Sequence, residues 1–204
     1  MPEHPARLLL VRHGESTWNA EHRWQGHSDP PLSPLGEKQA RVAASAVAEL
    51  GFTAVVSSDL LRARQTAELL APPGLDVVVE PAFKERTVGE WEGLTRDEID
   101  EQYPGMRKAH RSPPGFESDE SVVARVEPAL IAVAAARGAC TTTLVVTHGG
   151  VIRSLERHLG APSPEPVPNL GGRWFDVAAA VLTIGDREVL VDPDDATLTA
   201  AEEQ

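Results

Sequence analysis

The chain alternates between short apolar runs and longer stretches that carry helix-capping residues. The first apolar run holds four consecutive large aliphatic residues, 8–11, a pattern typical of a strand buried on both faces of a sheet. Shorter runs recur along the chain, and helical signals lie between them. We predict strands at 8–11, 54–56, 76–80, 144–146, 175–184 and 188–191.

Capping residues indicate where the helices begin and end. Ser33 followed by Pro34 is typical of an N-cap and a first helical position, and Gly51 is typical of the residue after a helix. We expect Asp59 to cap the next helix, and the sequence 95–98 forms a capping box. We predict helices at 34–50, 60–70, 96–103, 118–137 and 151–159.

Strands that alternate with helices predict an α/β protein, a three-layer sandwich in which helices flank a mostly parallel central sheet. We expect a single domain over 1–204 with its core over about 7–191. The segment 95–118 is expected to form a lid, and the polar, acidic tail 192–204 is expected to be disordered.

Two predicted strands end in almost the same residues. The first is followed by Arg12, His13 and Gly14, and the strand at 144–146 by the sequence Thr-His-Gly-Gly, 147–150. The carboxyl ends of parallel strands meet at one edge of the sheet, where α/β proteins bind their ligands. The second histidine also precedes a helix, whose N-terminus favours an anion. The sequence therefore predicts an anion site with two histidines at this edge.

Composition limits the classes of partner. Lys and Arg number 19 against 31 Asp and Glu, a formal net charge of −12, so we expect no nucleic-acid partner. No apolar run approaches the roughly 20 residues that a bilayer span needs, so we expect no membrane partner. Residues 1–7 do not resemble a signal peptide, and the single Cys140 is compatible with a reducing compartment, so we expect a cytoplasmic protein.

Five segments, in this order, resemble the histidine phosphatase superfamily, also called phosphoglycerate-mutase-like. They read LVRHGESTWN at 10–19, PLSPLGEKQA at 31–40, SSDLLRARQTA at 57–67, ERTVGEWEGL at 85–94 and VTHGGVIR at 146–153. The resemblance implies the three-layer α/β fold of that family and a phosphatase or mutase that works on phosphate esters. Within the family, the sequence most resembles the phosphatase branch, and is similar to glucosyl-3-phosphoglycerate phosphatases and broad-specificity acid phosphatases.

The resemblance also implies roles for residues that would hold the phosphate. His13 matches the nucleophile that forms a phosphohistidine, and Arg12 and Arg62 match the two arginines that clamp the phosphoryl oxygens. His148 matches a second histidine in contact with the phosphate, and Asn19 matches a neutral donor. From the residues alone, packed core histidines, a surface arginine and a turn asparagine are the alternatives.

Two further residues match the family pattern. Gly149 would let its amide approach the phosphate, and Glu85 would protonate the leaving oxygen, although Glu90 and Glu92 lie close in sequence. The chain shows no metal-ligand spacing, so we expect no metal and no cofactor.

The substrate is less well specified. His148 follows Glu85 by 63 positions, a shorter separation than cofactor-dependent mutases of this family generally have. This favours hydrolysis of a small phosphorylated metabolite, a sugar phosphate or a phosphoglycerate-type ester. A phosphoglycerate mutase and a phosphoprotein phosphatase are the alternatives, and relatives suggest a homodimer. The predicted substrate contacts, each with packing or solvent exposure as its alternative, are Trp24, Arg107, Lys108 and Arg111.

Overall fold

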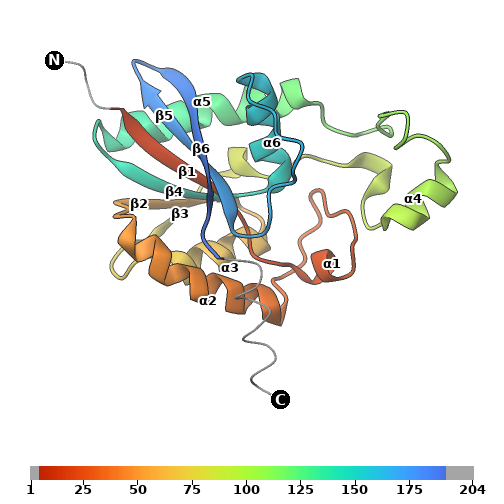
Figure 1. Cartoon of the computed structure of the whole chain (residues 1–204), viewed down its shortest axis with the longest axis horizontal. Coiled ribbons are helices and arrows are strands. Elements are labelled where there is room, and N and C mark those ends of the chain that lie inside the picture. The colour runs from red at the N-terminus through yellow and green to blue at the C-terminus, as the bar shows by residue number, and fades with distance from the viewer. Residues whose placement is uncertain (1–4, 192–204) are drawn as a thin grey trace.

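A computed structural model describes residues 5–191, which form a six-stranded sheet in the order β3-β2-β4-β1-β5-β6 (Figure 1). The four strands β3, β2, β4 and β1 pair in parallel, whereas β5 pairs in antiparallel fashion with both of its neighbours, β1 and β6. The predicted mostly parallel sheet is confirmed. The strands are β1 (Ala6–Arg12), β2 (Ala54–Ser57), β3 (Val77–Val79), β4 (Thr142–Thr147), β5 (Gly171–Ala178) and β6 (Val181–Val189).

Helices cover both faces of the sheet, with α2 and α3 on one side and α5 and α6 on the other (Figure 1). The α-helices are α1 (Thr17–Ala20), α2 (Pro34–Glu49), α3 (Leu61–Leu70), α4 (Arg96–Gln102), α5 (Asp119–Arg137) and α6 (Gly149–His158). Two short 3₁₀ turns, Pro81–Phe83 and Gly89–Trp91, lie between β3 and α4. None of the helices within 5–191 is long and apolar enough to cross a membrane.

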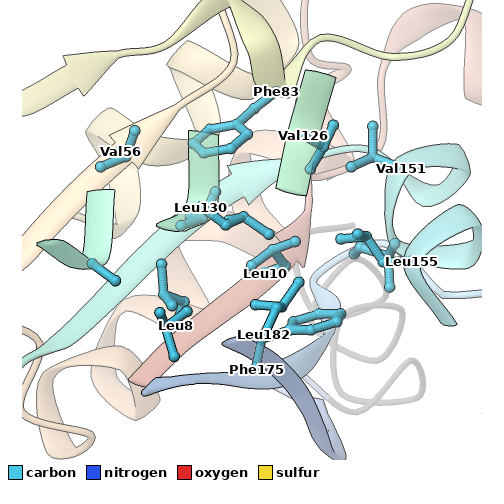
Figure 2. Packing of buried hydrophobic residues seen from close by; sticks show 14 of the residues in the cluster. Leu8, Leu10, Val56, Phe83, Val126, Leu130, Val151, Leu155, Phe175 and Leu182 are labelled. Atoms are coloured by element: carbon cyan, nitrogen blue, oxygen red, sulfur yellow. The ribbon is translucent and has the colours of Figure 1, made fainter. Parts of the chain in front are cut away.

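The central strand β1 separates two hydrophobic cores. Side chains alternate across a strand, so Leu8 and Leu10 pack with α5 and α6, and Leu9 and Val11 pack with α2 and α3. Figure 2 shows the first core, where Leu10 lies among Val126, Leu130 and other side chains. Both faces of β1 are covered, which explains why its sequence is uniformly aliphatic.

Most predicted helix ends are confirmed, but the cap of α3 is different. Ser33 accepts a hydrogen bond from the Gly36 amide at the start of α2. At α3, Asp59 does not cap, because its carboxylate pairs with Lys84 at 2.9 Å. Instead Asp29 Oδ1 accepts the Leu61 amide at 2.5 Å, so the cap comes from a loop about 30 residues earlier.

The predicted boundaries of the last two strands are wrong. The segment 175–184 was expected to be one strand, yet the chain reverses inside it at Ala179 and Ala180. These two residues have φ of 49° and 59°, in the left-handed region. Two-residue hairpin turns of this kind usually carry Asn-Gly, and a pair of alanines inside an apolar run gives no such signal. The predicted tail, 192–204, lies outside the described residues.

The hairpin turn predicts a stabilising substitution. Ala180→Gly removes the steric cost of a Cβ at positive φ and should raise the free energy of unfolding by about 1 kcal/mol, measured by urea denaturation. Ala135→Gly, at an exposed position inside α5, should lower it by a similar amount. A loss of stability in both variants would contradict the turn conformation.

Candidate functional site

The two predicted histidines meet at the carboxyl edge of the sheet. Arg12 and Thr147 are register partners at the ends of β1 and β4, so His13 and His148 leave the sheet side by side. Their ring centroids lie 5.2 Å apart with an angle of 61° between the planes. His13 is 3% exposed and His148 is fully buried.

His13 is held as a neutral ring with one defined tautomer. Its Nδ1 lies 2.6 Å from the carbonyl oxygen of Gly14, and a carbonyl can only accept, so Nδ1 carries the hydrogen. Burial, together with the positive charges of Arg62 and Arg12, holds the pKa of His13 well below its usual value. The lone pair therefore resides on Nε2, which accepts a hydrogen bond from Arg62 Nε at 3.2 Å.

Arg62 is almost completely buried beside that lone pair. Its two terminal nitrogens donate to the carbonyl oxygens of Ser28 and Gly26 at 2.8 and 3.1 Å. Burial lowers the pKa of Arg62 to about 10, which still leaves the side chain charged at neutral pH. Arg64, two residues later on α3, is exposed. Helical geometry thus directs one arginine of this pair to the site and the other to solvent.

Arg12 supplies the second cation at the same edge. Its Nη1 donates to the carbonyl oxygen of Val167 at 2.8 Å, and burial lowers its pKa. A guanidinium group stays charged in spite of such shifts, so two fixed positive charges flank His13.

The hydrogen bonds of Ser58 determine the tautomer of His148. Ser58 Oγ accepts the Leu60 amide at 3.2 Å and lies 2.9 Å from His148 Nε2. Among the described residues this buried hydroxyl donates no other hydrogen bond, so we assign its hydrogen to Nε2 and place the hydrogen of His148 on Nδ1. That Nδ1 is buried and has no partner within 5–191. Burial, and to a smaller extent nearby positive charges, hold the pKa of His148 well below its usual value, so the ring is neutral. It can serve as a donor to an anion.

Glu85 lies at the N-terminus of α6. Its two carboxylate oxygens accept the backbone amides of Arg86 and Gly150 at 2.9 and 3.1 Å. Gly150 makes this approach possible, because a Cβ there would lie 2.3 Å from Glu85 Oε1. At Gly149 a Cβ would meet Arg12 Cδ at an ordinary 3.4 Å. Sequence reasoning selected Gly149, and the structure adds Gly150.

Asn19 lies in α1 and lines the cavity. Its Oδ1 accepts hydrogen bonds from the amide and hydroxyl of Ser16 in a capping box at the start of α1. That contact occupies the oxygen and leaves the Nδ2 group, with no hydrogen bond among the described residues, available as a donor.

These side chains surround a cavity of about 1050 Å³. His148 lies beneath the surface and does not line it. The segment 95–118 forms part of the wall through Thr95, Arg96, Asp97 and Phe116, while its closure as a lid stays a prediction. Of the predicted phosphate-site residues, those on the cavity surface are Arg12, His13, Asn19, Arg62, Glu85 and Gly149.

The predicted substrate contacts separate into two groups. Trp24 lines the cavity and also packs edge-on against Trp91, with 5.3 Å between the ring centroids, and its contact with a substrate stays a prediction. Arg107, Lys108 and Arg111 do not line the cavity, and Arg107 forms an ion pair with Asp100 at 2.6 Å. Their contact with a substrate stays a prediction without support from the geometry.

Other arginines, which sequence reasoning missed, line the cavity instead. Arg153 and Arg157 follow Gly149 at steps of four residues on α6, and Arg86 follows Glu85. The four-residue spacing from the Gly-Gly pair was the signal that could have found the first two. Within 5–191 no group of three or more His, Cys, Asp or Glu side chains could hold a metal ion.

The family model described as the histidine phosphatase superfamily (branch 1) matches residues 8–188. The chain belongs to this superfamily. A glucosyl-3-phosphoglycerate phosphatase from Mycolicibacterium vanbaalenii is 34% identical over 202 residues, with 91% of this chain and 90% of the relative covered. A 2,3-bisphosphoglycerate-dependent phosphoglycerate mutase from Methylocella silvestris is 37% identical over 179 residues, with 80% and 85% covered.

A solved structure of a mycobacterial glucosyl-3-phosphoglycerate phosphatase in complex with VO3 has the same fold. The TM-score is 0.80 at 32% identity, and the match covers 90% of this chain and 98% of that one. The predicted family is confirmed, and with it the predicted class of enzyme, a phosphatase of the histidine phosphatase superfamily.

The packing of Glu85 against α6 predicts a difference between two adjacent glycines. Gly150→Ala should displace the Glu85 carboxylate and lower kcat for p-nitrophenyl phosphate by at least about tenfold, within the range for loss of an acid–base group. Gly149→Ala has room for its Cβ and should have a smaller effect. Equal decreases of kcat in the two variants would contradict the explanation that a Cβ at position 150 displaces the Glu85 carboxylate.

The Ser58 hydroxyl predicts a change that is visible by spectroscopy. Ser58→Ala should shift the neutral His148 ring toward the Nε2–H tautomer, which ¹⁵N NMR detects, and should lower kcat for p-nitrophenyl phosphate. Ser58→Thr retains the hydroxyl and should retain the tautomer and most of the rate. An unchanged His148 tautomer in the alanine variant would contradict the assignment.

Proposed function

We propose that this protein hydrolyses phosphate monoesters through a phosphohistidine formed on His13 Nε2, without a metal ion. The substrate is a small phosphorylated metabolite of the phosphoglycerate type. The observation that carries the proposal is the neutral His13, whose Nδ1–H is fixed by the Gly14 carbonyl so that the lone pair lies on Nε2 between two buried cations.

The first step transfers the phosphoryl group to the enzyme. The Nε2 lone pair attacks phosphorus, the bond between phosphorus and the ester oxygen breaks, and the alcohol leaves with a proton from the Glu85 carboxyl. The Nε–H of Arg62 turns from Nε2 to a phosphoryl oxygen, and Arg12 and Asn19, which line the cavity, donate to the others. The contact of the buried His148 with the phosphate stays a prediction.

The second step releases inorganic phosphate. The Glu85 carboxylate takes a proton from a water molecule, the water oxygen attacks phosphorus, and the bond between Nε2 and phosphorus breaks. Glu85 suits both roles because backbone amides fix its position at the mouth of the phosphate site. No step requires a metal ion, because the guanidinium groups and Asn19 stabilise the phosphoryl oxygens through charge and hydrogen bonds.

Two observations favour hydrolysis over mutase activity. The segment between Glu85 and His148 is short, as noted above, and the chain aligns over nine-tenths of its length with a relative named as a phosphatase. The name of that relative, glucosyl-3-phosphoglycerate phosphatase, supports a phosphoglycerate-type ester. The relatives named as mutases make the mutase reaction the second candidate.

Substitution of the nucleophile tests this mechanism. His13→Ala should reduce phosphate release from p-nitrophenyl phosphate by at least about a thousandfold, as loss of a nucleophile does. Wild-type protein quenched in alkali with ³²P-labelled substrate should carry label, and the variant should not. Residual activity within about tenfold of wild type would exclude His13 as the nucleophile.

Matched controls test the cations, the metal and the mutase alternative. Arg62→Gln should lose activity whereas Arg64→Gln, which changes an exposed charge on the same helix, should not. EDTA should leave the rate unchanged. Isomerisation of 3-phosphoglycerate after priming with 2,3-bisphosphoglycerate, faster than phosphate release, would favour the mutase.

A further inference from the structure

One face of α6 lines the cavity from the phosphate site outward. Gly149 and Gly150 lie at its N-terminus, and Arg153 and Arg157 lie on the same face. At a rise of about 1.5 Å per residue, Arg153 lies about 6 Å along the helix axis from Gly149, and Arg157 about 12 Å. A guanidinium group therefore stands one helical turn from the place where the phosphoryl group would bind.

The positive charge of this wall is only partly compensated. Asp119 accepts hydrogen bonds from both Arg157 and Arg86, with Arg157 Nη2 at 2.7 Å, so one carboxylate serves two guanidinium groups. Burial would raise the pKa of Asp119, but these hydrogen bonds hold it well below its usual range, so the carboxylate stays ionised. Arg153 is exposed and has no carboxylate within ion-pair distance in the part of the chain described.

The acidic residues of the cavity lie on other elements. Glu15 and Glu21 lie next to α1, Asp97 lies on α4, and Glu85 packs against the N-terminus of α6 at the phosphate site, whereas α6 itself contributes no acid to the lining. Glu15 Oε1 is occupied by a hydrogen bond from Ser33. In a chain with a formal charge of −12, Arg86, Arg153 and Arg157 line this part of the cavity, and Asp119, which does not line it, pairs with only two of them. The local excess of positive charge favours a negatively charged ligand.

We propose that Arg153, with Arg157 beside it, binds a second anionic group of the substrate, a carboxylate, while the phosphoryl group binds at His13. The planar guanidinium fork matches a carboxylate, and Arg153 is free to rotate toward one. This inference rests on the proposed function and assigns the recognition of a carboxylated ester to α6 rather than to the predicted run 107–111.

Two substrates that differ mainly in the carboxylate provide the test. 3-Phosphoglycerate carries a carboxylate where glycerol 3-phosphate carries a hydroxymethyl group. Wild-type protein should show a kcat/KM for 3-phosphoglycerate about ten- to a hundredfold above that for glycerol 3-phosphate, the range of a charge-assisted hydrogen bond. Arg153→Gln should remove most of this ratio and change the glycerol 3-phosphate value by less than about threefold. Arg153→Glu should lower the ratio further.

Arg96→Gln is the matched control, because Arg96 is also exposed and lines the same cavity from α4. An equal fall of the ratio in this variant, or a fall of both substrates together in Arg153→Gln, would overturn the inference. Fructose 1,6-bisphosphate and fructose 6-phosphate form a second pair. If Arg153→Gln lowers the preference for the bisphosphate more than it lowers the preference for 3-phosphoglycerate, Arg153 recognises a second phosphate rather than a carboxylate. That result would overturn the assigned substrate class.

The failure of the inference is distinguishable from the failure of the proposed function. A wild-type protein that releases phosphate from none of these esters would contradict the proposed hydrolysis. In that case calorimetric Kd values for the two three-carbon esters on His13→Ala, with and without Arg153→Gln, still decide whether Arg153 recognises the carboxylate. If Arg153→Gln leaves the ratio of the Kd values for glycerol 3-phosphate and 3-phosphoglycerate unchanged, Arg153 does not recognise the carboxylate.

Discussion

The parallel pairing of β1 with β4 places Arg12 opposite Thr147, and the chain therefore leaves the sheet twice at the same point, each time with a histidine. Both strands are buried between helical layers, so neither can shift its register without moving its aliphatic side chains out of the two cores. The distance between the two imidazole rings is thus set by main-chain hydrogen bonds in the middle of the protein. The rigid sheet, rather than the loops, fixes the chemistry of the edge.

Burial then determines the charges at this edge. Both histidines are neutral because burial disfavours the charged ring and a further positive charge beside Arg12 and Arg62 is unfavourable. The two arginines donate hydrogen bonds to carbonyl oxygens rather than to carboxylates. The negative charge of Glu85 stabilises both guanidinium groups, and Asp29 and Glu92 also stabilise that of Arg62. Positive electrostatic potential is therefore concentrated around His13, in a protein whose net charge is strongly negative.

Local patterns in the sequence predict much of this arrangement. The aliphatic runs predict β1, β2 and β4, the Ser33 and Thr95 caps predict where α2 and α4 begin, and the two His-Gly sequences after strands predict the paired histidines. Contacts between distant segments are not visible in this way. The cap that Asp29 provides for α3, the hydroxyl of Ser58 on His148 and the carboxylate of Asp119 between two arginines all join residues at least 30 positions apart. The turn at Ala179 and Ala180 escaped prediction because the fold imposes a conformation that alanine does not favour.

The loop over residues 26–29 holds Arg62 with two main-chain carbonyls and caps the helix that carries it with Asp29. A carbonyl is present whatever the side chain, so evolution can vary Ser28 widely while the support of Arg62 persists. A change in the number of residues is a different matter, since it would move both carbonyls and the cap at once. The loop over residues 26–29 is therefore constrained in its length although it carries no recognisable motif. Among functional variants, insertions and deletions in this loop should be far rarer than substitutions.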